Sequence, residues 1–462
     1  MRVAVVGAGV GGLVAAELLS ARGHDVDVYE RWPGLGGQAA TLDIGQGHRI
    51  ERYYHVLLAT DWDMRRLYDR LGMPDELEFR ESTVAMFAGG RLHPFTTPVD
   101  LLRYRPLSLR SRLRLGWSVL MLHHRHRGVG PFENITAREW IERSMGPEVY
   151  ERVWGPLLRG KFGARADDIA MAWLWSKLML RRQLRGREAR RELLGYGRHG
   201  WEPLFAALAA RIQKAGGRVL IDRPVARLAR EGAGFVLTPA APGSFRRGLD
   251  PREFEPTGES ERYDGVIATV PNDVFEALLD PPLRQALGSA YLERLRACEY
   301  NAAVCLVLEL DRQFAPFFWM NVVDADIPFV GLVEHTNFVP PGRYNGRRFL
   351  YVANYVDWSD PLMRGDADAL ISLYTPALRR INPAFEGAWI RNAWLFREPH
   401  AQPIVTVGYR RRIPPPRTPV PGLWLINTTQ VFPEDRGTNY AVRLADQAVS
   451  GLLEQAQGAG SA

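Results

Sequence analysis

The first 37 residues constrain the fold more than any other stretch, because they place a glycine-rich turn inside a strand, helix and strand unit. An apolar run at Val3 to Val6 predicts a short strand, and the next six residues read G-A-G-V-G-G, which satisfies the pattern G-x-G-x-x-G. The apolar residues that follow predict a helix, and the alternation from Asp25 to Val28 predicts a second strand that ends at Glu30. The order of these elements predicts a complete βαβ unit rather than an isolated turn.

The glycines of this motif predict the ligand. Gly7 permits a tight turn, Gly9 removes the Cβ that would block a diphosphate, and Gly12 lets the helix pack close to the strand, while Gly11 completes the motif. A diphosphate there would meet the free N–H groups and the positive dipole end of the helix. The Glu30 carboxylate can accept hydrogen bonds from both ribose hydroxyls of an adenosine. The unit therefore predicts binding of an adenine dinucleotide.

A second glycine pair follows the acidic residue. Residues 30–37 read E-R-W-P-G-L-G-G, and this segment resembles the FAD superfamily that includes monoamine oxidases, protoporphyrinogen oxidases, carotenoid desaturases and UDP-galactopyranose mutases. In that superfamily the pair brings the backbone close to the cofactor, which implies FAD contacts at Arg31, Gly36, Gly37 and Gln38. Gln38 stands where amine oxidases usually carry arginine, and this departure argues against a strict amine-oxidase assignment.

Two later blocks resemble the same superfamily in the same order. Residues 197–225 match its return to the cofactor domain, and in relatives the residue at the position of Val225 meets the adenine with backbone groups. The last block is a strand, a loop and a helix whose N-terminus in relatives points at the FAD diphosphate and flavin. The resemblance implies that Asp435 holds the ribityl chain or bound water. It also implies that the N–H groups from Gly437 through Thr438 to Asn439 meet the flavin O2 side.

Two side chains are candidates for acid–base chemistry. The segment around His55 resembles the part of UDP-galactopyranose mutases where a histidine lies beside the flavin; in the alternative, His55 caps or packs against the helix that follows it. The segment W-G-P-L-L-R-G-K-F-G at residues 154–163 resembles the second domain of the superfamily, which covers the flavin and shapes the substrate cavity. Within it, Lys161 faces the flavin or an anionic substrate, or else lies on the surface.

These blocks predict an α/β fold in which a Rossmann-type FAD-binding domain (GR2-like) is interleaved with an α+β substrate domain. We expect the FAD-binding domain at residues 1–80, 196–297 and 416–455, a mostly helical part of the substrate domain at 81–195, its sheet at 298–415, and a disordered tail at 456–462. Further expected elements are a hairpin at Met86–Leu92, strands at Tyr263–Pro271, Val304–Leu310, Phe329–Val333, Phe349–Tyr355 and Leu423–Ile426, helices at Leu204–Ala215, Ala367–Ile381 and Thr438–Leu453, and an exposed, mobile insertion at Pro239–Arg262.

Arginine dominates the charge of the chain. The net charge of +7 and the pI of about 9.5 suit anionic lipid, acidic substrates or nucleic acid. Between Leu101 and Arg127, seven arginines enclose an apolar helix that carries Trp117. Such a helix can lie in a membrane interface, or it can pack on its own domain with a solvated arginine face. We expect a small organic substrate, with an anionic membrane surface as a candidate partner and no nucleic acid.

The cellular location is predicted from absences in the sequence. No apolar run approaches the ~20 residues that a membrane-spanning helix needs, and the chain begins directly with a strand, which predicts no signal peptide. The two cysteines lack metal-binding spacing and fit a reducing cytoplasm. The tract with His123, His124 and His126 contains no carboxylate or cysteine that could complete a metal site, so we expect no metal there. These features predict a cytoplasmic protein, with peripheral attachment to the inner face of the membrane as the alternative.

The resemblance implies an FAD-dependent oxidoreductase. Its organic substrate, of the amine, porphyrinogen or polyene and isoprenoid type, would give a hydride to flavin N5, and oxygen or a quinone would reoxidise the cofactor. The chain has one dinucleotide fingerprint, which argues against a reductase that takes electrons from NADPH. The alternative is an isomerase like UDP-galactopyranose mutase acting on a nucleotide sugar, which the similarity around His55 and the excess of arginine favour. A noncatalytic flavin-bearing protein is the third interpretation.

Overall fold

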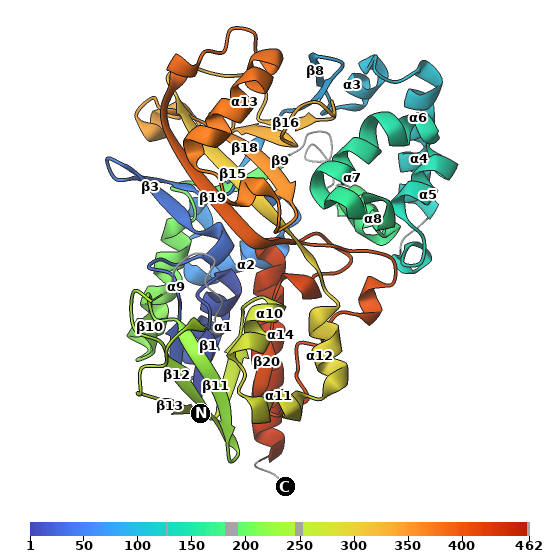
Figure 1. The fold of residues 1–462 in the computed structure, drawn as a ribbon. Helices are drawn as coiled ribbons and strands as arrows, with labels where there is room; N and C mark the ends of the chain where they lie inside the picture. The colour runs from blue at the N-terminus through green and yellow to red at the C-terminus, as the bar shows by residue number, and fades with distance from the viewer. Residues whose placement is uncertain (126–127, 181–192, 245–252, 460–462) are drawn as a thin grey trace.

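The computed structural model of the protein describes residues 1–125, 128–180, 193–244 and 253–459. A parallel sheet and a larger mixed sheet occupy opposite ends of the molecule, and a group of helices lies beside the mixed sheet (Figure 1). Each sheet collects strands from segments that are far apart in the sequence.

The parallel sheet has five strands and forms the lower part of Figure 1. Its strands in spatial order are β10 (Arg218–Leu220), β2 (Asp25–Tyr29), β1 (Arg2–Val6), β14 (Gly265–Ala268) and β20 (Leu423–Leu425). Alternate residues of β1 face opposite layers, as the twofold period of a strand requires. Val3 and Val5 pack in the core with the helices, whereas Ala4 and Val6 pack in the core on the other face.

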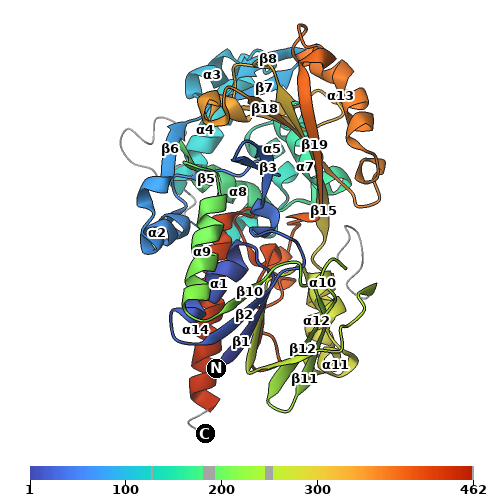
Figure 2. The same ribbon diagram turned by 90° about the vertical axis from the view of Figure 1, so that its left-hand side faces the viewer.

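Helices cover one face of this sheet and a mixed layer covers the other. On the first face α1 (Val10–Ser20), α9 (Glu202–Lys214) and α14 (Thr438–Ala459) lie side by side, as Figures 1 and 2 show. The second face is covered by β11 (Val225–Glu231), β12 (Gly234–Pro239), β13 (Glu261–Tyr263), α10 (Asn272–Leu278), α11 (Pro281–Leu287) and α12 (Ser289–Arg296). The predicted βαβ unit is confirmed, and α1 joins β1 to β2 within it.

The mixed sheet has seven strands, which pair antiparallel except for β16 with β7. In spatial order they are β19 (Ile390–Pro403), β15 (Tyr300–Leu310), β18 (Arg348–Val356), β17 (Gly331–Glu334), β16 (Trp319–Val322), β7 (Val84–Ala88) and β8 (Arg91–Pro94). Helix α13 (Ala367–Ile381) packs on one face of this sheet through a shared apolar core. The predicted strands and helix of this region are confirmed, and the predicted hairpin contributes its two strands to the same sheet.

The helical group has its own apolar core. It comprises α3 (Pro98–Arg103), α4 (Leu109–Arg125), α5 (Ala137–Ser144), α6 (Pro147–Val149), a π-helical turn at Tyr150–Trp154, α7 (Gly155–Phe162) and α8 (Met171–Leu180). The remaining elements lie between the two large sheets: the hairpin β3 (Thr41–Gly45) and β4 (His48–Glu51), helix α2 (Trp62–Leu71), and the small sheet of β5 (Leu57–Leu58), β9 (Leu193–Gly197) and β6 (Leu77–Glu81). Strands β6 and β9 pair with each other and cross the predicted domain boundaries at residues 80 and 195.

Several predicted boundaries are wrong. Tyr263 belongs to β13, and the parallel strand β14 begins only at Gly265, because β12 recruits residues 261–263 as an antiparallel partner. Residues 456–459 continue α14 instead of forming a tail, and residues 460–462 lie outside the described residues. Within the predicted exposed insertion, residues 245–252 are also outside the description, whereas Phe254 is buried. Strands β16 and β19 were not predicted, since their polar residues hide the strand pattern.

Candidate active site

A cavity of about 1540 Å³ lies between the two large sheets. Its floor is made where the strands of the parallel sheet end, and it includes the glycine-rich turn after β1, the end of β2 and residues that follow β14 and β20. Strands β15, β18 and β19 and helices α7 and α8 contribute the opposite walls. Ligands of open parallel sheets bind outside the carboxyl ends of the strands, so the cavity lies where the fold predicts a ligand.

The first glycine turn is shaped by two different steric demands. Gly7 has a φ of 106°, which favours glycine, and a Cβ on Gly12 would lie only 1.9 Å from the Gly7 carbonyl oxygen. Gly12 is therefore needed for the close packing of α1 on β1. A Cβ on Gly9, in contrast, would meet only the Gly37 Cα, at 3.9 Å. Protein packing leaves space at Gly9, and a diphosphate of a bound dinucleotide would fill that space.

The second glycine pair packs directly on the first turn. Gly36 donates its N–H to the Ala8 carbonyl oxygen at 2.9 Å and has a φ of 100°, and a Cβ there would lie 2.4 Å from the Phe205 ring. A Cβ on Gly37 would lie 3.0 Å from the Gly9 Cα. The pair therefore packs closely on the first glycine turn, and its approach to the cofactor stays a prediction. Gly11 also lines the cavity, where α1 meets α14.

Glu30 holds the end of β2 to the glycine turn. Its carboxylate accepts the Ala8 N–H at 2.7 Å and the Trp32 N–H at 2.9 Å, one bond on each oxygen. The side chain is buried at the cavity wall, and burial raises its pKa. Each oxygen keeps further lone pairs, so the carboxylate remains able to accept ribose hydroxyls.

Three other predicted contacts also line the cavity. Arg31 follows Glu30 along the wall, and Val225 is buried at the start of β11. Gln38 donates from Nε2 to the His400 carbonyl oxygen at 2.9 Å, so its side chain is fixed against β19. The glycine cradle, the acidic residue and these neighbours fit an adenine dinucleotide at this end of the cavity.

Asp435 is held by side chains of α7, α8 and β19. Its Oδ2 lies 2.7 Å from the ammonium groups of both Lys161 and Lys177, and its Oδ1 accepts hydrogen bonds at 3.1 Å from Trp173 Nε1 and Gln402 Nε2. Four donors thus surround the two carboxylate oxygens, and the contact of Asp435 with the ribityl chain or bound water stays a prediction. Burial alone would raise the pKa of Asp435, but the two ammonium groups hold it well below its usual range.

The surface interpretation of Lys161 is wrong, because its ammonium lies in the cavity. It stands 5.1 Å from the centre of the Trp173 ring and 5.6 Å from that of Tyr355, and burial lowers its pKa. Sequence reasoning missed Lys177, which projects from the next helix to the same carboxylate. It also missed Arg436, whose Nη2 donates to the Tyr355 hydroxyl at 2.9 Å. One local feature offered a clue, since the chain has only three lysines in 462 residues.

The three residues at the start of α14 that are predicted to contact the flavin lie in two different environments. Gly437 and Thr438 line the cavity, where the first N–H groups of the helix have no intrahelical partner. Asn439 instead turns to α2, and its Oδ1 accepts the N–H groups of Asp63 at 2.8 Å and Met64 at 3.1 Å. Its side chain joins two helices rather than facing the cavity.

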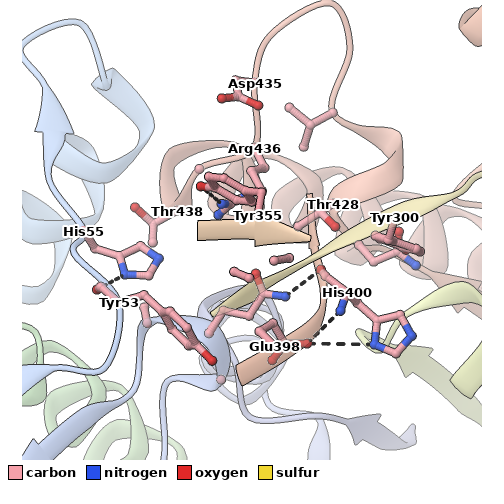
Figure 3. A pocket seen from close by; sticks show the side chains of 18 of the residues that line it. Tyr53, His55, Tyr300, Tyr355, Glu398, His400, Thr428, Asp435, Arg436 and Thr438 are labelled. Atoms are coloured by element: carbon pink, nitrogen blue, oxygen red, sulfur yellow. Dashed lines mark hydrogen bonds and ion pairs between the residues drawn. The ribbon is translucent and has the colours of Figure 1, made fainter. Parts of the chain in front are cut away.

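His55 lines the cavity and does not cap the neighbouring helix. Its Nδ1 lies 2.7 Å from the Tyr53 carbonyl oxygen, a contact that Figure 3 shows among the lining side chains. Burial lowers its pKa to about 4, and Arg436 contributes in the same direction. The imidazole is therefore neutral near pH 7.

A second histidine lines the cavity from β19. His400 Nε2 lies 2.8 Å from Asp273 Oδ2. Its Nδ1 lies 3.8 Å from Glu398 Oε1, and Figure 3 shows these two side chains next to each other. The Tyr300 ring meets this imidazole edge-on at 5.2 Å. No sequence motif pointed to this group, because its members come from three separate elements. Among the described residues, no set of three or more His, Cys, Asp or Glu side chains is placed to hold a metal ion.

The fold and the cavity together define an α/β protein with a dinucleotide-type cradle at one end of the cavity and a second chamber at the other. The family described as flavin containing amine oxidoreductase matches residues 10–429, and the chain belongs to this family. Its cofactor is accordingly FAD.

Individual relatives match parts of the sequence. A zeta-carotene desaturase of Synechocystis sp. is 34% identical over 93 residues, which are 20% of this chain and 19% of that protein. The mitochondrial protoporphyrinogen oxidase of Nicotiana tabacum is 25% identical over 173 residues, 37% of this chain and 34% of that protein. The chain thus spans about a fifth to a third of the length of these curated relatives.

Solved structures match nearly the whole chain at low identity. An oxidoreductase from Methanosarcina mazei has a TM-score of 0.71 at 16% identity and covers 97% of this chain and 100% of its own. Cyclohexylamine oxidase from Brevibacterium oxydans has a TM-score of 0.70 at 14% identity, with 99% of both chains covered. A reduced UDP-galactopyranose mutase has a TM-score of 0.68 at 14% identity and covers 98% of this chain and 95% of its own. These likenesses show the shared fold.

Proposed function

We propose that this protein is an FAD-dependent oxidoreductase that oxidises a small organic substrate. The observation that carries the proposal is the single cavity in which a dinucleotide cradle continues into a chamber walled by β15, β18, β19, α7 and α8. Bound FAD would supply a hydride acceptor, with oxygen or a quinone as the final electron acceptor. The family assignment and the low-identity structural matches support this class of reaction without naming the substrate.

The chain itself contributes binding, orientation and charge. Gly9 and the paired Gly36–Gly37 loop make room for the diphosphate, Glu30 accepts the ribose hydroxyls, and Arg31, Gln38 and Val225 line the same part of the cavity. The N–H groups at Gly437 and Thr438, together with the helix dipole of α14, would stabilise negative charge on the cofactor ring.

We assign distinct roles to the two catalytic candidates. A neutral His55 offers one ring nitrogen to the cavity as a hydrogen-bonding group, because the other nitrogen is engaged by Tyr53. Lys161 is paired with Asp435, so it acts as a fixed positive charge rather than as a free base. Neither residue is required to transfer a proton at neutral pH in this scheme.

An absorbance spectrum of purified protein tests the proposal. We expect about one flavin bound per protein chain. Anaerobic addition of the correct substrate should reduce this flavin and thereby bleach the visible absorbance band of its oxidised form. Amines, porphyrinogens and polyenes form the first screen. Protein that takes up no flavin after reconstitution with FAD would contradict the proposal.

A UDP-galactopyranose mutase-like isomerase is the second candidate, and the cationic group around Asp435 favours it because ammonium and guanidinium groups bind diphosphates. An isomerase would convert a nucleotide sugar only after chemical reduction of the flavin, without net bleaching or reoxidation. Incubation of dithionite-reduced protein with UDP-sugars distinguishes the two candidates.

We also propose that the face formed by α3 and α4 docks on an anionic membrane from the cytoplasmic side. Leu109, Leu113, Trp117 and Leu120 form a stripe on α4 and are 45–61% exposed. Arg112 donates to the Leu102 carbonyl oxygen within its own helical group. Exposed arginines at positions 103, 105 and 110 flank the stripe and would meet lipid phosphates. Among the described helices, none is long and apolar enough to cross a membrane.

Sedimentation with phosphatidylserine-containing liposomes at low salt tests this docking. We expect wild type to bind and a Leu113→Ser, Trp117→Ser variant to stay in the supernatant. Leu373→Ser on α13 is the matched control, because Leu373 is 48% exposed on another surface. Equal sedimentation of the double variant and wild type would contradict the proposal.

A further inference from the structure

Lysine is rare in this protein, and its distribution is uneven. The chain contains three lysines among 59 basic residues, at positions 161, 177 and 214. Lys214 is exposed at the end of α9, whereas Lys161 and Lys177 both reach Asp435 inside the cavity. The other basic positions are arginine, so the two cavity lysines are not explained by a general basic surface.

The group around Asp435 carries more positive than negative charge. Lys161, Lys177 and Arg436 provide three cations, and Asp435 provides one carboxylate. Within the described part of the chain, no second carboxylate lies within ion-pair distance of these three side chains. Arg436 instead bonds with two neutral groups, the Tyr355 hydroxyl and the Gln402 amide oxygen. An excess of two positive charges therefore faces the cavity.

The remaining carboxylates of the cavity are already engaged. Glu30 accepts two backbone N–H groups, and Asp61 accepts the Leu58 N–H at 2.8 Å. Asp273 and Glu398 lie against His400. The last lining carboxylate pairs with a guanidinium: Glu276 with Arg296. A protonated amine entering the chamber would therefore find no unpartnered carboxylate among the described lining residues, and it would be repelled by the cations.

Aromatic rings hold the two lysines in place. The Lys177 ammonium stands 4.8 Å from the centre of the Trp173 ring, on which Lys161 also lies. The Lys177 side chain is 38% exposed, so its ammonium keeps donors for a ligand beyond Asp435. Trp154 and Leu157 add apolar surface to the same wall. Such a wall suits an organic molecule with an apolar body and an anionic head.

We propose that Lys161, Lys177 and Arg436 form a subsite for an anionic group, carboxylate or phosphate, of the substrate. The substrate of this protein is therefore an organic anion and not a protonated amine. This inference rests on the proposed function, in that it defines which substrate class the chamber takes. Asp435 serves in it as the fixed counter-ion that keeps two ammonium groups charged and close together.

Calorimetric titration of the FAD-loaded protein tests the subsite with three amphiphiles of equal chain length: octanoate, octyl phosphate and octylammonium. We expect the two anions to bind and octylammonium not to bind. In Lys177→Gln and Lys161→Gln the anions should bind about tenfold more weakly, because each variant loses a charge-assisted hydrogen bond. Lys214→Gln, which changes the exposed third lysine, should bind like wild type. The tighter of the two anions identifies the head group as carboxylate or phosphate.

Amine labelling followed by mass spectrometry gives an independent readout on unmutated protein. Burial lowers the pKa of Lys177 to about 8, so acetic anhydride at pH 8 should label it readily. A saturating concentration of octanoate or octyl phosphate should protect Lys161 and Lys177 and leave Lys214 fully labelled. Unchanged labelling of the cavity lysines, tighter binding of octylammonium, or wild-type anion affinity in Lys177→Gln would each overturn the proposal.

These readouts separate the subsite from the proposed function. Labelling and calorimetry do not require turnover, so anion binding by a protein that never bleaches with any substrate would refute the oxidase alone. A flavin that is reduced by neutral or cationic substrates, with no anion binding, would refute the subsite alone.

Discussion

The glycines at positions 9 and 12 belong to one motif, yet a methyl group would meet different neighbours at each. At Gly12 it would collide with the Gly7 carbonyl oxygen at 1.9 Å, whereas at Gly9 the nearest protein atom is 3.9 Å away. Gly9 has a φ of −69°, which any residue adopts. The protein therefore needs Gly12 for its own packing, whereas its packing alone does not require glycine at position 9; we propose that a bound diphosphate does.

Alanine substitutions at these positions should separate folding from cofactor binding. We expect Gly9→Ala to leave the stability of the apoprotein within about 1 kcal/mol of wild type, while FAD affinity falls at least about tenfold. Gly12→Ala should destabilise the apoprotein by about 3 kcal/mol, since backbone must move. Urea unfolding of the apoproteins and FAD titration measure both effects. Retention of stoichiometric FAD by Gly9→Ala would place the diphosphate elsewhere.

The Glu30 carboxylate accepts two backbone N–H groups, and we propose that it also binds the ribose of the cofactor. Glu30→Gln retains one acceptor oxygen, so one of the two backbone N–H groups at Ala8 and Trp32 loses its partner. We expect the apoprotein to lose about 1 kcal/mol of stability and FAD binding to weaken by a further ~1 to 3 kcal/mol. Fluorescence titration with FAD measures the loss of binding free energy. An unchanged FAD affinity would assign the ribose to another acceptor.

At the scale of elements, α2 obtains its N-terminal cap from another helix. Its own preceding residue Asp61 makes no capping hydrogen bond to the helix and instead accepts the Leu58 N–H. Asn439, in the first turn of α14, supplies the acceptor for the second and third N–H groups of α2. The cap therefore joins the first turn of α14 to the first turn of α2.

Loss of this cap should cost the usual free energy of a helix cap. We expect Asn439→Ala to lower the free energy of unfolding by about 1 to 2 kcal/mol, and Asn439→Asp to restore most of it, because an aspartate oxygen accepts the same bonds. Hydrogen exchange at Asp63 and Met64 should rise in the alanine variant alone. Equal stability of the alanine variant and wild type would show that α2 does not depend on the cap.

At the scale of the whole molecule, Glu51 joins three distant segments. Its carboxylate accepts the Tyr196 hydroxyl at 2.5 Å and the Trp201 N–H at 3.2 Å, and its carbonyl oxygen accepts the Tyr351 hydroxyl at 2.7 Å. The side chain is buried, and burial raises its pKa to about 7. The neutral form thus fits the folded state better than the charged form.

This raised pKa gives a pH dependence with a definite sign. Between the unfolded value near 4.5 and the folded value near 7, the folded state binds more protons, so the Glu51 contribution to stability falls as the pH rises. Glu51→Gln removes this titration. We expect the stability of the variant relative to wild type to increase by about 2 kcal/mol from pH 5 to pH 8. Urea unfolding at both pH values measures the difference, and a constant difference would contradict the assigned pKa.

The sequence predicted the parts of the site that are contiguous in the chain. The turn at Gly7–Gly12, Glu30 and the Gly36–Gly37 pair lie within 37 residues, and the period of a strand and the close packing of a helix fix their relative positions. The repeating apolar patterns likewise predicted most of the strands and helices, because each pattern records which face of an element is buried.

Only the tertiary structure decided how distant segments meet. Asp435 lies 274 residues from Lys161 and 258 from Lys177, and no spacing rule connects a loop before α14 with two helices of another group. The cap on α2 and the burial of Phe254 were hidden for the same reason. Local sequence determines which residues turn and pair with their neighbours, whereas contacts between segments depend on how two whole sheets pack. The sequence by itself therefore determined the cofactor cradle, and the packing of the chain decided the charge of the chamber that faces the substrate.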